Sequence, residues 1–157
     1  MLAQARQLSR RVVAPHDGPY LRALFADSRD DLLLLPSEVR EPLIDMQFEA
    51  QRRQIAAAHP DAVHEVLVVD GADVGRLVVA QSADAAHIVD ITIARASRRR
   101  GIATAVLREL IDAMSNPTIT LSVWAANIPA RRLYEQVGFV PCRTDAGYVA
   151  MERRTSP

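Results

Sequence analysis

Residues 101–114 carry apolar side chains along one stripe and lie between two segments rich in β-branched residues. Apolar positions that recur every three to four residues predict an amphipathic helix with one face on a core. The flanking segments, 87–93 and 118–124, are typical of strands. A helix between two strands of one sheet favours a parallel pair, and ligands of open sheets tend to bind at the carboxyl ends of such strands.

Hairpins and further helices are predicted around this central unit. Two β-branched segments flank residues 70–73, where Asp70-Gly71 favours a tight antiparallel turn. Strands are predicted at 8–13, 65–69, 74–80, 139–143 and 148–152, and helices at 19–28, 37–59 and 129–137. We therefore expect a single α/β (α+β) domain over residues 1–157 with a mixed sheet.

Three consecutive arginines at 98–100 precede the central helix. A helix N-terminus carries about half a positive charge and unpaired backbone N–H groups, so further positive charge is unfavourable there unless an anion binds. Gly101 and Ala103 are small, which lets a bulky anion approach the backbone. We predict that the N–H groups of residues 99–104 bind a phosphate, and a diphosphate suits the site. The alternative is a solvated basic helix start.

The composition argues against several other classes of protein. All 19 basic residues are arginine, so the lysine of a P-loop is missing, and a dinucleotide fingerprint would need three glycines where only Gly101 is present. Zero net charge and 4% aromatic residues disfavour a nucleic-acid partner. One cysteine and four scattered histidines give no metal-ligand spacing. No segment has the length of a membrane span or the pattern of a signal peptide, so we expect a cytoplasmic location and no membrane partner.

A second segment, residues 127–139, carries a motif of its own. It resembles the Asn-x-x-Ala-x-x-Leu-Tyr-x-x-x-Gly-Phe motif of the GCN5-related N-acetyltransferase (GNAT) superfamily, and the matching positions are Asn127, Ala130, Leu133, Tyr134, Gly138 and Phe139. Arg98, Gly101 and Ala103 resemble the Arg/Gln-x-x-Gly-x-Gly/Ala motif of the same superfamily. Either motif alone is weak, but both occur in order, each between a strand and a helix. The resemblance covers residues 74–140.

The resemblance implies a fold and a cofactor. The fold is a mixed, mostly antiparallel twisted sheet of six to seven strands with about four helices, in which two central parallel strands are splayed around acetyl-CoA. The arginine motif would bind the pyrophosphate of coenzyme A, and residues 91–93 and Asn127 would contact the pantetheine arm and the thioester. The cofactor-binding residues implied are Ile91, Thr92, Ile93, Arg98, Arg99, Arg100, Gly101, Ile102, Ala103, Thr104, Asn127, Ala130 and Tyr134.

Two residues are candidates for proton transfer. Tyr134 is the candidate general acid for the departing thiolate, and the alternative is that it only packs its helix on the sheet. An amine acceptor must lose a proton, and some superfamily members use a glutamate at the position of Ser122. Asp90, in an apolar segment, is the leading substitute, because burial suits a carboxyl group to accept a proton. His87 and Glu49 are weaker candidates, and Asp90 could instead face water or fix a loop.

The acceptor itself is not identified by any motif. The expected function is transfer of an acetyl group to a primary amine by direct attack in a ternary complex, and the alternative is a non-catalytic acyl-CoA-binding module. Acidic residues on the first two helices are interleaved with arginines, which indicates a solvated surface rather than an amine site. Trp124 either lines the acceptor site or packs in the core, and Cys142 is expected in the core. The protein is expected to be a monomer or a homodimer.

Overall fold

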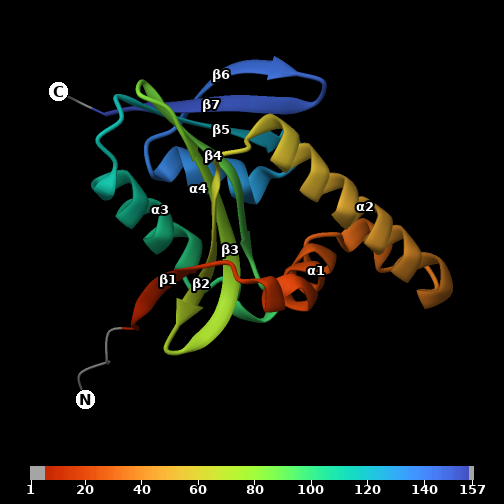
Figure 1. Cartoon of the computed structure of the whole chain (residues 1–157). Helices are drawn as coiled ribbons and strands as arrows, with labels where there is room; N and C mark the ends of the chain where they lie inside the picture. The colour runs from red at the N-terminus through yellow and green to blue at the C-terminus, as the bar shows by residue number, and fades with distance from the viewer. Residues whose placement is uncertain (1–5, 156–157) are drawn as a thin grey trace.

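One twisted seven-stranded sheet organises the protein (Figure 1). The structure is a computed structural model that describes residues 6–155. The strands lie in the order β1-β2-β3-β4-β5-β7-β6, and every neighbouring pair is antiparallel except β4 and β5. The strands are β1 (Leu8–Val12), β2 (Val63–Val69), β3 (Ala72–Gln81), β4 (Ala85–Ile93), β5 (Thr118–Trp124), β6 (Val140–Asp145) and β7 (Tyr148–Arg154). The helices are α1 (Gly18–Asp27), α2 (Ser37–Ala58), α3 (Ile102–Ala113) and α4 (Ile128–Gln136).

The predicted elements are present, and the expected mixed, mostly antiparallel sheet is confirmed. The hairpin between β2 and β3 turns through only two residues, Asp70 and Gly71, with φ of 50° and 81°. Positive φ at both positions is what a tight turn between twisted strands requires, which explains the Asp-Gly pair. Ala72 and Asp73, expected in the turn, belong to β3 instead.

The helices cover the two faces of the sheet in pairs, α1 and α2 on one side and α3 and α4 on the other (Figure 1). The apolar stripe of α3 packs on the larger core, to which β3, β5 and β7 also contribute Leu77, Ile119 and Met151. On the other face, Val66 and Val78 are fully buried. Both faces of the central strands are therefore covered, and the ends of β4 and β5 lie between the two layers.

The parallel strands β4 and β5 separate before they end. They pair only from Ala85 to Ile88 and from Thr118 to Leu121, although β4 continues to Ile93 and β5 to Trp124. The register between β3 and β4 shifts beside this point, so that Val89 has no partner on β3. Such a bulge bends a strand and increases its twist. The expected splayed pair is thus confirmed, with the opening at the carboxyl ends of both strands.

The expectation of a core cysteine is wrong. Cys142 lies on β6, whose six residues are all exposed, and its thiol donates a hydrogen bond to the Ala150 carbonyl oxygen at 3.2 Å. The cysteine is exposed because β6 is an edge strand that pairs only with β7. Within residues 6–155, no helix combines the length and the apolar content needed to cross a bilayer.

Candidate active site

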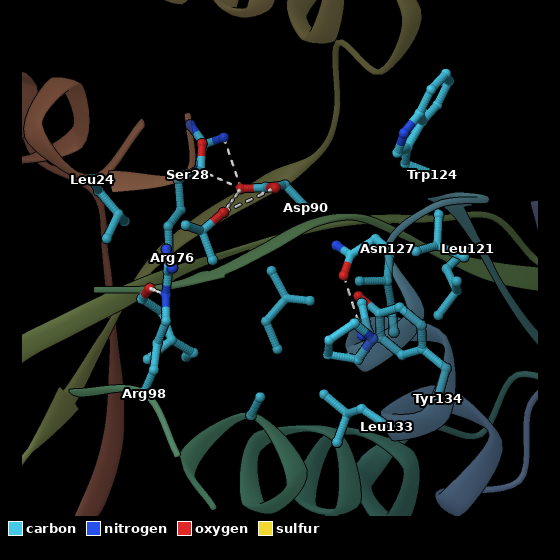
Figure 2. A pocket seen from close by; sticks show the side chains of 18 of the residues that line it. Leu24, Ser28, Arg76, Asp90, Arg98, Leu121, Trp124, Asn127, Leu133 and Tyr134 are labelled. Atoms are coloured by element: carbon cyan, nitrogen blue, oxygen red, sulfur yellow. Dashed lines mark hydrogen bonds and ion pairs between the residues drawn. The ribbon is translucent and has the colours of Figure 1, made fainter. Parts of the chain in front are cut away.

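A cleft of about 1130 Å³ begins where β4 and β5 separate (Figure 2). The ends of both strands line it, together with α1 on one side and the first turns of α3 and α4 on the other. Figure 2 shows Arg76 and Asp90 together on one side of the cleft and Tyr134 and Asn127 together on the other. Of the residues predicted to bind the cofactor, all but Arg100 line this cleft.

The loop before α3 forms a cradle of backbone N–H groups. Gly101 is the N-cap of α3 with φ of 74°, and Arg99 also has a positive φ of 61°. None of the N–H groups of residues 99–104 has an acceptor within residues 6–155. A Cβ atom added at Gly101 would meet nothing within 4 Å, so the space in front of the loop is open. This arrangement fits a large anion such as a diphosphate.

The guanidinium of Arg98 does not take part in that cradle. Its Nε donates to the Ile93 carbonyl oxygen at 3.0 Å and its Nη2 to the Asp27 carbonyl oxygen at 2.9 Å. Arg98 therefore ties the end of β4 to the end of α1. Arg100 lies outside the cleft, and Arg6 donates to its carbonyl oxygen at 3.2 Å. Of the three arginines, Arg99 alone combines a place in the cleft with a side chain free of any partner within residues 6–155.

Donor groups also face the cleft from β4 and α4. The Ala94 N–H donates to Val74 on β3, and successive N–H groups of an extended chain point to opposite edges, so the Ile93 N–H points toward the cleft. Asn127 is the N-cap of α4, and its Oδ1 accepts the Ala130 N–H at 3.3 Å. The side-chain NH₂ of Asn127 is consequently the part that remains to donate to a ligand.

Tyr134 both packs in the protein and lines the cleft. Its ring contacts Phe139 edge-on with centroids 6.1 Å apart, which is the packing role expected from sequence, and the same side chain borders the cavity. Burial, with a smaller contribution from the negative charge of Asp90, raises the pKa of Tyr134 to about 12. The phenol is therefore neutral at physiological pH and able to donate a proton.

Asp90 forms a polar cluster on the α1 and α2 side of the sheet. Its Oδ2 accepts a hydrogen bond from Arg76 Nε at 2.9 Å and forms an ion pair with Arg76 Nη2 at 2.8 Å, and Thr92 Oγ1 donates to the same carboxylate at 3.0 Å. Gln51 of α2 accepts a further bond from Arg76 Nη2 at 3.0 Å. Arg76 thus supplies the counter-charge for an ionised Asp90, the form that can accept a proton.

Arg76 is the site residue that the sequence analysis missed. It interrupts the apolar segment of β3 between Gly75 and Leu77 and is only 7% exposed. A charged residue inside a buried strand needs a partner, and this is the signal that would have singled it out. The pattern of β3 alone, however, does not say which carboxylate provides that partner.

The other candidate bases lie outside the cleft. His87 Nδ1 pairs with Thr120 Oγ1 at 2.8 Å, and its ring stacks on His59, so burial and this neighbour lower the pKa of His87. Glu49 is exposed and pairs with Arg52 at 2.8 Å. Ser122, at the position where the resemblance implies a glutamate in some superfamily members, does line the cleft.

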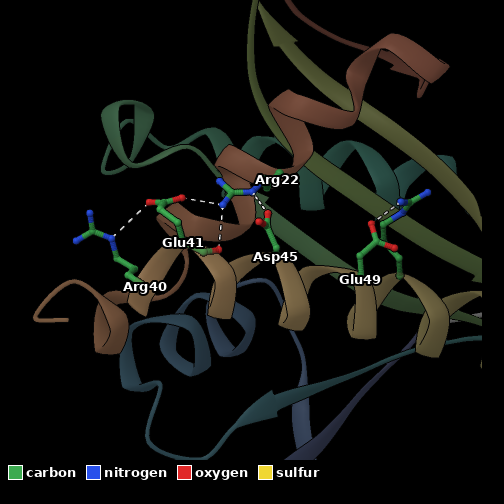
Figure 3. A network of polar contacts seen from close by, with 6 residues as sticks. Arg22, Arg40, Glu41, Asp45 and Glu49 are labelled. Atoms are coloured by element: carbon green, nitrogen blue, oxygen red, sulfur yellow. Dashed lines mark hydrogen bonds and ion pairs between the residues drawn. The ribbon is translucent and has the colours of Figure 1, made fainter. Parts of the chain in front are cut away.

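Three of the four acidic side chains of α2, Glu41, Asp45 and Glu49, pair with arginines (Figure 3). Arg22 of α1 pairs with Glu41 at 2.7 Å and also with Asp45. These pairs join α1 to α2 on the surface, as expected of a solvated helical face. Trp124 is 50% exposed, lines the cleft and contacts Tyr148 edge-on, so the core alternative for Trp124 is wrong. No group of three His, Cys, Asp or Glu side chains within residues 6–155 is arranged to hold a metal ion.

The model of the acetyltransferase (GNAT) family matches residues 26–139 of this chain. The chain belongs to this family. The GNAT chain is 35% identical over 91 residues to the L-amino acid N-acetyltransferase AaaT of Escherichia coli (strain K12), covering 53% of this chain and 56% of that protein. It is 37% identical over 68 residues to an N-alpha-acetyltransferase of Saccharolobus solfataricus, covering 41% of each. The matches therefore span about half the length of these curated relatives.

Solved structures share the fold over nearly the whole chain. The PaiA N-acetyltransferase from Thermoplasma acidophilum, solved in complex with coenzyme A, has a TM-score of 0.74 at 16% identity and covers 95% of this chain and 99% of that one. An acetyltransferase from Thermus thermophilus has a TM-score of 0.72 at 18% identity, with coverage of 95% and 97%. At these identities the likeness shows the GNAT fold and no more.

Proposed function

We propose that this GNAT protein is an acetyl-CoA-dependent N-acetyltransferase that acts on a primary amine. One observation carries the proposal: the splayed ends of β4 and β5 open a single cleft that joins the N–H cradle before α3 to both Tyr134 and Asp90. The names of the sequence relatives and the coenzyme A complex of PaiA support the same reaction class and co-substrate.

The hydrogen-bond donors that face the cleft would bind acetyl-CoA. The N–H groups of residues 99–104, with Arg99, would hold the diphosphate, while Ile102, Ala103 and Thr104 form the first turn behind it. The backbone of residues 91–93 and the Asn127 amide would hold the pantetheine arm, with Ala130 beside it. When bound, acetyl-CoA supplies the activated acetyl group. The backbone N–H of Ile93 would polarise the carbonyl oxygen of the thioester.

Two side chains would move the protons. An alkylammonium has an unperturbed pKa near ~10.4, so the acceptor must lose a proton before it attacks. Asp90 would receive that proton, directly or through a water, because its carboxylate borders the cleft and has Arg76 beside it. Tyr134 would donate its phenol proton to the departing thiolate from the other side. The amine attacks directly while both substrates are bound.

Thiol release over a panel of amines tests this proposal. In Tyr134→Phe we expect kcat to fall by about 10²–10⁴-fold, the usual contribution of a general acid, while coenzyme A affinity is retained. Tyr148→Phe is the matched control, since Tyr148 is exposed and does not line the cleft. Unchanged turnover in Tyr134→Phe would contradict the assigned role.

A second candidate function is a non-catalytic acyl-CoA-binding module, and the hydroxyl of Ser122 in place of a carboxylate favours it. Saturable coenzyme A binding without thiol release from any amine would establish this alternative. The cytoplasmic location, the single-domain organisation over residues 1–157 and a monomeric or homodimeric state remain predictions from the sequence.

A further inference from the structure

We infer that the acceptor is a zwitterion, in which a carboxylate sits on the carbon next to the amine, and that Arg76 binds this carboxylate. The inference rests on the proposed acetyltransferase function and narrows its acceptor. It starts from Arg76, which lines the cleft although it is only 7% exposed.

Arg76 keeps donor capacity that the protein does not use. Its Nε and Nη2 donate to Asp90 and Gln51, whereas Nη1 has no acceptor within residues 6–155. Among those residues, Tyr20 Oη is the one fully buried side-chain polar atom that lacks a partner. Arg76 Nη1 is therefore not sealed inside the protein and can be reached by a molecule in the cleft. A planar guanidinium is well suited to carboxylates.

The charge balance of the cleft points to the same class of acceptor. Asp90 is balanced by Arg76, Asp30 by Arg95, and Arg98 is held by carbonyl oxygens. The α1 and α2 side of the cleft thus has no spare carboxylate for the several positive charges of a polyamine. A zwitterion brings its own balancing charge, so burying it leaves no uncompensated charge.

The geometry accommodates such a pair of charges. Arg76 Nη2 lies 2.8 Å from Asp90 Oδ2, so Nη1 of the same planar guanidinium is also near this carboxylate, as the carboxylate of an α-amino acid is near its ammonium. The acceptor's ammonium would meet Asp90 while its carboxylate meets the free Nη1 of Arg76. Leu21, Leu24 and Phe25 of α1, with Trp124, supply an apolar surface for the rest of the acceptor.

A matched pair of acceptors tests the inference on the intact protein. L-phenylalanine and L-phenylalaninamide share amine and side chain but differ in the carboxylate. We expect kcat/KM to favour the acid by about 10- to 100-fold, the size of one or two hydrogen bonds to a charged group. The amine of the amide is the less basic one, so more of it is unprotonated at neutral pH. Amine basicity alone would favour the amide and cannot produce the expected preference.

Substitution of Arg76 then assigns the preference to this residue. In Arg76→Gln we expect KM for the acid to rise by about tenfold or more while KM for the amide changes little. Arg22→Gln is the matched control, since Arg22 pairs with Glu41 and Asp45 on the surface and does not line the cleft. If Arg76→Gln does not fold, Arg76→Lys is the variant to measure, because lysine keeps the positive charge. We expect Arg76→Lys to retain only part of the preference for the acid.

Each outcome decides one claim. Equal or better turnover of the amide, or turnover of polyamines but not of amino acids, would contradict a zwitterionic acceptor. Neither result would contradict the proposed acetyltransferase function. A preference for the acid that persists in Arg76→Gln would overturn the role of Arg76. Absence of thiol release with every amine tested would instead overturn the proposed function itself.

Discussion

In the proposed reaction, the Tyr134 phenol would serve both packing and chemistry. Its ring packs against Phe139, and the burial that results is the main cause of its raised pKa, with the Asp90 charge second. Both effects disfavour the phenolate, because it would be a charge taken out of water beside another negative charge. The packing of α4 on the sheet therefore keeps this phenol protonated.

The raised pKa of Tyr134 sets the pH dependence expected of its proposed role. Because the pKa of Tyr134 is raised to about 12, essentially all of the phenol is protonated at neutral pH. The protonated form is lost only as the pH rises through that value. The factor by which Tyr134→Phe lowers kcat should therefore be constant from about pH 7 to pH 10. Parallel pH profiles of both proteins at saturating substrates would check this. A factor that shrinks above pH 9 would indicate a phenol with the ordinary pKa near ~10.

At the scale of elements, β3 positions the end of β4 that lines the cleft. Gly75 on β3 lies against β4 so closely that an added Cβ would be 2.4 Å from the Thr92 carbonyl oxygen and 3.2 Å from Ile93 Cδ1. Gly75 pairs with Ile93 in the sheet, beside the proposed thioester site. A glycine is required here for close approach of two strands rather than for its φ.

Gly75→Ala should disturb both stability and coenzyme A binding. We expect the free energy of unfolding to fall by about 1–3 kcal/mol, which is typical of overpacking. Coenzyme A should also bind more weakly, because β4 must shift at residues 92 and 93. Gly71→Ala is the control. Its Cβ would meet nothing within 4 Å, but its φ is 81°, so we expect about 1–2 kcal/mol of strain with coenzyme A affinity unchanged. Denaturant unfolding and coenzyme A titration measure the two effects. Unaltered affinity in Gly75→Ala would show that this contact does not position the site.

At the scale of the whole molecule, the cleft lies between the two helical layers. Arg98 ties β4 to α1, and Gln51 of α2 accepts a hydrogen bond from Arg76 of β3, so α1 and α2 are fastened to the sheet through polar contacts. The other side of the cleft is formed by α3 and α4, whose apolar faces contribute to the larger core. A ligand that spans the cleft would therefore contact both layers and stabilise the whole fold.

Coenzyme A should raise the melting temperature accordingly. A ligand at 100 times its Kd that binds only the folded state adds about 2.7 kcal/mol, which for a chain of this size is about 5–10 °C. The measurement is a thermal melt at increasing coenzyme A concentration, with adenosine as a control that lacks the diphosphate. No shift at any concentration, or an equal shift with adenosine, would contradict the assigned diphosphate cradle.

Local patterns in the sequence were enough to predict the family, the βαβ unit and the N–H cradle before α3. The apolar stripe of α3, the Asp70-Gly71 turn and the motif residues Gly101 and Asn127 each act through neighbours a few positions away. Such short-range constraints are visible in residue spacing, since helix periodicity and capping depend on local geometry. The splayed strands were expected only through the resemblance to the GNAT superfamily, because pairing between strands is not local.

Only the tertiary structure decided which charges meet. All three arginines were predicted to bind the cofactor, yet Arg98 ties two elements together, Arg99 faces the cleft and Arg100 lies outside it. Asp90 was selected as a candidate base without its partner, because Arg76 lies 14 positions away on the neighbouring strand. The sequence by itself determined the elements and the N–H cradle before α3, because helix periodicity and the loop conformation depend on local geometry. The register of β3 against β4 determined the pairing of Arg76 with Asp90, because electrostatic partners are set by distance in space and not by spacing along the chain.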